Sequence, residues 1–213
     1  MADIELMRFI ERAPLRTVRW EDVAAHVPNA ARTLARLADM GALTRIARGV
    51  YIAPPEGADG RTWKPPLEAA ALALGTARYG QRRVVLAGIG AARHWGAIPR
   101  ALANTTLAVA VRGRQPVTLE TGGTVTFVHR NLEQLDATLE PTVLGEALVA
   151  TPAQTIFDLT RRHNGVIPER DTDEAVRNLM SRITKEELAD IALRAQRVPA
   201  AVTRILNQRA LDG

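Results

Sequence analysis

The chain has 213 residues, of which 46% are hydrophobic and 24% charged, and this is the balance of a folded protein long enough for two modules. It has no cysteine, no apolar run near the roughly 20 residues that cross a bilayer, and no signal-peptide pattern, which excludes disulfides and membrane spans and predicts a cytoplasmic protein. The net charge of +5 is typical of proteins that bind a polyanion, and nucleic acid is the commonest soluble one.

The start of the chain predicts short helices. Apolar residues at helical spacing indicate a helix over residues 3–12 and a second helix over residues 20–26. Pro28 should end the second helix, because proline disfavours a helical conformation in the residue before it. Asn29 is a favourable N-cap residue for a third helix that begins at Ala30.

The third helix carries polar residues on the side opposite its apolar stripe. The stripe is expected on Ala31, Leu34, Leu37 and Ala38. This leaves Arg32, Thr33 and Arg36 facing water, where an arginine paired with guanine provides about 1 to 3 kcal/mol of discrimination between bases. A cation in the first helical turn costs up to roughly 1 kcal/mol, so Arg32 favours an anionic ligand there. The alternative is that these arginines are an ordinary solvated surface.

Residues 43–53 predict a β-hairpin with a tight turn at residues 47–49. Arg45 and Arg48 flank a tip that is narrow enough to approach a phosphate or the minor groove, although the hairpin would also serve to close the core. Two helices, a turn, a third helix and a hairpin predict a winged helix-turn-helix over residues 1–53, whose third helix can enter a major groove. The expected DNA-binding residues are Asn29, Arg32, Thr33, Arg36, Arg45, Arg48 and Tyr51.

The remainder predicts a linker and a second domain. Residues 54–66 hold four prolines and two glycines without periodicity, which favours a linker. Residues 67–213 are expected to form a mixed α/β domain that ends in helices, so the fold class is α+β. Expected helices are 67–78 and 91–95, further helices begin after Thr151, after Thr184 and at Pro199, and expected strands are 83–87, 106–111, 116–119, 125–129 and 147–150.

Two groups of arginines in the second domain are candidates for secondary contacts with the DNA backbone. One group precedes a strand and the other occupies a hairpin tip, and together they are Arg78, Arg82, Arg83, Arg112 and Arg114. A solvated surface explains these arginines equally well.

Two fragments are similar to parts of enzymes without completing a motif. Residues 88–90 read Gly-Ile-Gly, but the third glycine of a dinucleotide-binding loop would fall at Arg93, which favours a packing role. Asp171 and Asp173 imitate the acidic pair of a nucleotidyltransferase, yet they precede a helix, where N-capping explains them better. We therefore expect no catalytic residues, no metal and no cofactor.

The hairpin and two later segments resemble AbiEi-type antitoxins, the transcriptional regulators of type IV toxin–antitoxin systems. Residues 41–51 contain the leucine, the basic pair and the Arg-Gly-Val-Tyr run of that family, and residues 86–96 and 150–159 are similar to its C-terminal domain. Gln154 stands where relatives often have arginine. The resemblance covers roughly residues 1–165 and does not extend to the last forty or so.

The resemblance implies a repressor that binds inverted repeats in duplex DNA at its own operon through the N-terminal module. It also implies that the protein counteracts a cognate nucleotidyltransferase-like toxin, with the C-terminal domain contributing to both tasks. The alternative function is a stand-alone winged-helix transcriptional regulator whose second domain senses a ligand or dimerises.

Overall fold

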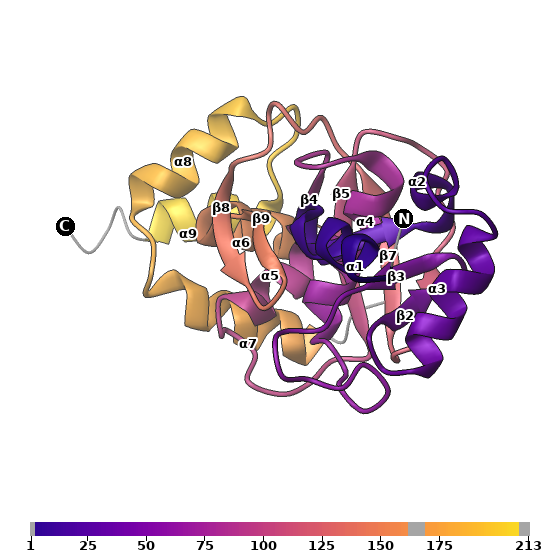
Figure 1. Cartoon of the computed structure of the whole chain (residues 1–213). Coiled ribbons are helices and arrows are strands. Elements are labelled where there is room, and N and C mark those ends of the chain that lie inside the picture. Colours follow the sequence, from indigo (N-terminus) through magenta and orange to yellow (C-terminus); the bar gives the residue numbers. More distant parts are fainter. Residues whose placement is uncertain (1–2, 162–168, 209–213) are drawn as a thin grey trace.

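Helices and a small antiparallel sheet form the N-terminal part of the computed structural model, which describes residues 3–161 and 169–208 (Figure 1). The elements are α1 (Asp3–Arg12), the 3-10 helix η1 (Pro14–Arg16), β1 (Thr17–Arg19), α2 (Trp20–Ala24), α3 (Ala30–Asp39), β2 (Thr44–Ala47) and β3 (Val50–Ile52). Strand β3 lies between β1 and β2 and pairs antiparallel with both. This order of elements is compatible with a winged helix-turn-helix. The short strand β1 was not predicted.

Helix α3 begins at the predicted residue, but its first turn is built differently. Asn29 has a left-handed backbone with φ of 54° and its side chain makes no capping hydrogen bond, so the predicted side-chain cap is wrong. Side-chain capping needs an extended N-cap backbone, and the left-handed conformation does not provide one. The buried positions are Ala30, Leu34 and Leu37, so Ala31 is exposed instead of lying in the apolar stripe.

The three-stranded sheet is shared between two hydrophobic cores. Successive residues of β3 point to opposite faces of the sheet. Tyr51 packs with Leu34 and the other apolar residues of α1 to α3, whereas Val50 and Ile52 belong to the core that surrounds α4 (Leu67–Tyr79). The boundary at residue 53 stays a prediction, and the sheet beside it contributes side chains to both cores.

The segment after the hairpin folds back onto the end of α3. Gly60 N donates to Gly41 O at 2.7 Å, and Thr44 Oγ1 donates to Gly60 O at 2.9 Å. Gly41 has a φ of +80°, and a Cβ at this position would overlap the carboxylate of Asp59. The residues expected to form a linker are therefore held against the hairpin that precedes them.

A six-stranded mixed sheet forms the centre of the C-terminal part (Figure 1). In the order β6-β7-β5-β4-β9-β8, the strands are β6 (Val117–Thr118), β7 (Thr124–His129), β5 (Asn104–Val109), β4 (Val84–Ala87), β9 (Gly145–Ala150) and β8 (Ala137–Thr142). All residues of β4 are buried, as expected for a central strand, and β4 pairs antiparallel with β5 and parallel with β9. The edge strand β8 was not predicted, because its half-buried residues lack a regular alternation.

Helices at the end of the chain form a separate core with α5 (Gly88–His94). They are α6 (Pro152–Thr160), α7 (Glu169–Met180), α8 (Lys185–Arg194) and α9 (Ala200–Gln208). The predicted caps at Thr151 and Thr184 are confirmed, since Thr151 Oγ1 accepts from Gln154 N at 3.2 Å and Thr184 exchanges two hydrogen bonds with Glu187. Among the described residues, no helix is long and apolar enough to span a membrane.

Candidate nucleic-acid interface

The exposed side of α3 presents the residues predicted to contact bases. Arg32 is exposed in the first turn, and its side chain makes no hydrogen bond or ion pair with any described residue. Asn29 is exposed beside it, and Thr33 is half-buried. Arg32 is therefore an unpaired cation at the positive end of the α3 dipole, and this placement is unfavourable for a cation. A phosphate that binds there would be attracted by both the arginine and the helix end, which offsets that cost.

Arg36 lies one turn further along α3 and has a partner that the sequence did not reveal. Its Nη2 lies 2.7 Å from Asp3 Oδ1 and 2.8 Å from Asp3 Oδ2, at the first residue of α1. The side chains of Arg36 and Asp3 are 47% and 51% exposed. A pair this exposed contributes only about 0 to 1 kcal/mol, so a DNA contact worth more than that would displace Asp3.

The hairpin tip consists of Arg48 and Gly49, between β2 and β3. Arg48 is exposed and has no ion pair with any described residue. Gly49 has a φ of +73°, and a Cβ there would lie 2.7 Å from Trp20 Cδ1. Trp20 N also donates to Gly49 O at 3.0 Å, so the N-terminus of α2 fixes the turn and with it the position of Arg48.

The base of the hairpin is attached to the C-terminal sheet. Arg45 Nε lies 3.1 Å from Glu120 Oε1, and Glu120 N donates to Ile46 O at 2.9 Å. Glu120 belongs to the turn between β6 and β7. The cation of Arg45 thus has an acidic partner, in contrast to the free cation of Arg48.

Tyr51 must be removed from the predicted DNA-binding residues. Its side chain is 4% exposed and packs in the N-terminal core with Val18 and Leu43. The alternation of β3 explains this, because the face opposite Val50 and Ile52 lies against α1 to α3. The Arg-Gly-Val-Tyr run therefore contributes one surface cation and one core aromatic residue.

Arg19, the last residue of β1, forms an ion pair with an acidic neighbour. Its Nη2 donates to Asp22 Oδ1 at 2.8 Å, and its backbone N donates to Asp22 Oδ2 at 3.0 Å. The hydrogen bond with Asp22 raises the pKa of Arg19. Burial alone would raise the pKa of Asp22, but the hydrogen bonds from Arg19 together outweigh it, and the pKa of Asp22 lies below its ordinary value.

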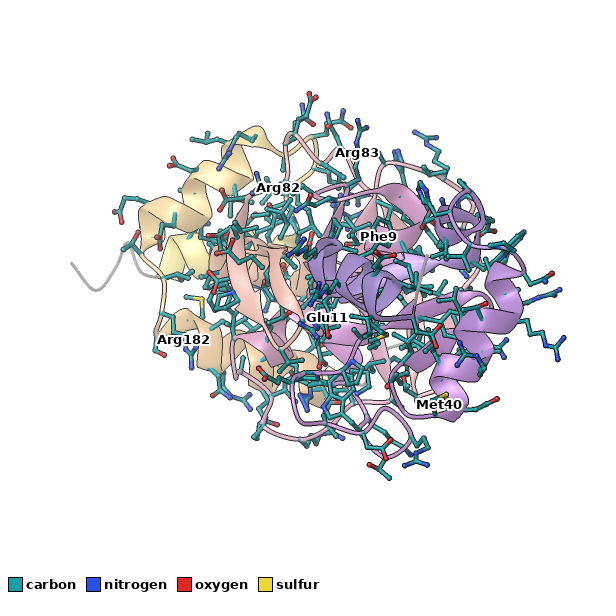
Figure 2. All side chains as sticks on the ribbon, viewed as in Figure 1. Phe9, Glu11, Met40, Arg82, Arg83 and Arg182 are labelled. Carbon is teal, nitrogen blue, oxygen red and sulfur yellow. The ribbon has the colours of Figure 1, made fainter. Side chains whose placement is uncertain are left out.

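The secondary arginines gather at one end of the C-terminal part. Arg78, Arg82 and Arg83 are all exposed around the connection from α4 to β4. Figure 2 shows Arg82 and Arg83 in the upper part of the view, away from Met40, the residue after α3, at the lower right. Arg112 and Arg114 are exposed in the loop after β5. The guanidinium of Arg114 lies over the ring of Tyr79, 5.7 Å from its centroid, which joins the two groups.

The fragments similar to enzyme motifs have structural roles. A Cβ at Gly90 would overlap the side chain of Thr105, so this glycine lets α5 approach β5, as a packing role predicts. Asp171 lies inside α7 and pairs with Arg100, so its predicted N-capping role is wrong. The part of the chain that the structure describes contains no group of three or more side chains suited to hold a metal ion.

Comparison with known proteins identifies the C-terminal part. The family model for the AbiEi antitoxin C-terminal domain matches residues 84–208, and this range includes α7 to α9, which the sequence resemblance had left unassigned. The crystal structure of the RV2827C protein from Mycobacterium tuberculosis is similar in fold, with a TM-score of 0.57 and 18% identity over 87% of this chain and 69% of that chain. No curated protein matches the sequence.

Proposed function

Because this chain belongs to the AbiEi antitoxin family, we propose that it represses its own operon through a winged helix-turn-helix at residues 3–53 and counteracts a nucleotidyltransferase-like toxin in a type IV system. The family is regulatory rather than catalytic, which agrees with the structural roles of Gly90 and Asp171. The observation that carries the DNA-binding half is the presence of two exposed cations without ion partners among the described residues. Arg32 begins the candidate recognition helix, and Arg48 forms the tip of the candidate wing.

The two cations suit different parts of a duplex. A helix that enters the major groove by its N-terminal end brings its first turn to the base edges, where Arg32 can form two hydrogen bonds with guanine. A wing tip reaches the backbone or the minor groove beside the helix, where Arg48 meets phosphates that carry no sequence information. Specificity would therefore come from α3, and Arg48 would add affinity for any sequence.

Binding to duplex DNA from upstream of the chain's own gene tests the repressor half. The full chain should bind this DNA about a thousandfold or more tightly than an unrelated duplex, a ratio common for specific repressors. Arg48→Ala should weaken both complexes alike and reduce the slope of log K against log salt by about one. Fluorescence anisotropy over a series of salt concentrations measures both quantities. Equal affinity of the wild type for the two duplexes would refute operator recognition.

Co-expression with the gene that neighbours it tests the antitoxin half. If the neighbour encodes a nucleotidyltransferase-like protein, its expression alone should arrest growth, and expression of the full chain from an unrelated promoter should restore it. A variant that combines Arg32→Ala with Arg48→Ala separates repression from neutralisation. If neutralisation does not depend on DNA binding, this variant should also restore growth. Continued growth arrest in the presence of the wild-type chain would contradict the antitoxin assignment.

A further inference from the structure

A basic pocket lies where the C-terminal sheet meets the C-terminal helices. It has a volume of about 380 Å³ and is lined from the loop after β5, the end of β7, α6 and α8. Its wall includes Phe157 and Ile191, which are 3% and 5% exposed, so the pocket reaches the packed interior. This volume falls within the roughly 300 to 1,000 Å³ of small-molecule sites. Helix α8 lies at the opposite end of the molecule from α3 (Figure 1), so the pocket is separate from the candidate recognition helix.

Positive charge in the wall greatly exceeds negative charge. Four arginines line the pocket, and they are Arg112, Arg130, Arg161 and Arg194. No acidic side chain is among the described residues of the lining, and the carboxylate nearest to Arg130 is that of Asp158, which lies behind the wall at 3.6 Å and is 2% exposed. Among the described residues of the wall, one carboxylate therefore faces four arginines, an excess of about three positive charges.

Arg130 and Arg161 each have some partners in the protein. Nη1 of Arg130 donates to His129 O at 3.1 Å, and the guanidinium of Arg161, an exposed residue, lies over the Phe157 ring, 5.7 Å from its centroid. The Nε of Arg130 is buried and has no hydrogen-bond acceptor among the described residues. Loss of hydration lowers the pKa of Arg161, the positive charge of Arg130 lowers it further, and Asp158 only partly opposes this. Buried polar groups in proteins are nearly always hydrogen-bonded, so this Nε is suited to an acceptor that enters the pocket.

We propose that this pocket binds a small molecule with a polyphosphate group, such as a nucleoside triphosphate. Guanidinium groups form paired hydrogen bonds with phosphate oxygens, and several adjacent phosphates match several adjacent arginines. Beside the arginines, the lining offers the amides of Asn131 and Gln134, which suit the polar edge of a base. This inference goes beyond the proposed function and does not depend on it, although a bound nucleotide would give the antitoxin a means to respond to a small ligand.

The concave shape favours a small molecule over a DNA backbone. A duplex is convex and presents its phosphates along a line, so it would reach the exposed arginines of the rim but not the wall formed by Phe157. The exposed arginines are Arg112, Arg161 and Arg194. The buried Nε of Arg130 would then stay without an acceptor. The geometry therefore selects a ligand that enters the pocket.

Isothermal titration calorimetry of the full chain at constant ionic strength tests the proposal with sodium tripolyphosphate, ATP and GTP as separate probes. We expect saturable binding with one ligand per chain, and Arg161→Gln should weaken it about tenfold or more, since a hydrogen bond to a charged group is lost. Arg161 is the preferred position because removal of Arg130 would leave the buried Asp158 without that cation. Arg177→Gln, an exposed arginine of α7, is the matched control and should bind as the wild type does.

The three probes and a competitor identify the ligand. Tighter binding of a nucleotide than of tripolyphosphate supports a nucleotide site, and equal binding supports a site for the polyphosphate group alone. The proposal is overturned if none of the three probes binds saturably, if Arg161→Gln binds as tightly as Arg177→Gln, or if a short duplex DNA displaces the bound probe. Thermal unfolding of the ligand-free Arg161→Gln variant should match the wild type, which shows that a lost affinity is not a lost fold.

Discussion

Replacement of Arg32 and Arg36 together by alanine is expected to weaken binding to the chain's own upstream DNA by at least about 2 kcal/mol, or roughly thirtyfold, because each arginine that reads a base provides about 1 to 3 kcal/mol. Affinity for an unrelated duplex should fall much less. Parallel anisotropy titrations of the two duplexes measure the difference. A double variant that keeps full preference for the upstream DNA would remove α3 from the role of recognition helix.

The single variants should differ because of their neighbours. Arg32 has no ion pair with any described residue, so its full contribution is available to DNA. Arg36 must first leave Asp3, which costs up to about 1 kcal/mol at this exposure. Arg32→Ala should therefore have the larger effect, and Arg177→Ala on α7 is the matched control that should leave binding unchanged.

Local patterns predicted those parts of the fold that short-range interactions determine. The helical spacing of Leu34 and Leu37 located α3, and the Arg48-Gly49 turn located the hairpin, because residues close in sequence are enough to indicate these features. The caps at Thr151 and Thr184 follow from residues within one turn. The exposed positions of Arg32 and Arg48 follow from the same local rules, so these candidates for DNA contact were accessible from the sequence.

Features that depend on distant residues were missed. Strand β1 is only three residues long and exists because Val18 pairs with Tyr51 across the sheet. The partners Asp3 and Glu120 are far in sequence from Arg36 and Arg45, and nothing in the local pattern indicates them. Since tertiary contacts decide which cations are already neutralised, the sequence could propose the arginines but could not rank them.

Replacement of Ile52 by alanine is expected to lower the free energy of unfolding of the whole chain by about 2 to 5 kcal/mol, the range for large-to-small changes in a core. Ile52 is fully buried in the central strand of the N-terminal sheet, opposite Thr17 on one side and Thr44 on the other, and its side chain packs in the core around α4. The cavity would therefore open at the junction of the two parts. Urea unfolding followed by circular dichroism measures the loss.

The shared sheet also predicts how the transition is organised. The sheet contributes side chains to both cores, so both parts of the chain should unfold in one transition. In Ile52→Ala, the midpoint of unfolding measured by tryptophan fluorescence should therefore move to lower urea together with the midpoint measured by circular dichroism. Trp20 beside the hairpin turn contributes to the fluorescence signal. Ile4→Ala, at a position that is 68% exposed, deletes the same atoms from the surface and should change stability by less than about 0.5 kcal/mol. If one signal is lost at lower urea than the other in Ile52→Ala, the N-terminal part unfolds independently. The C-terminal core would then contribute little to holding the hairpin in place.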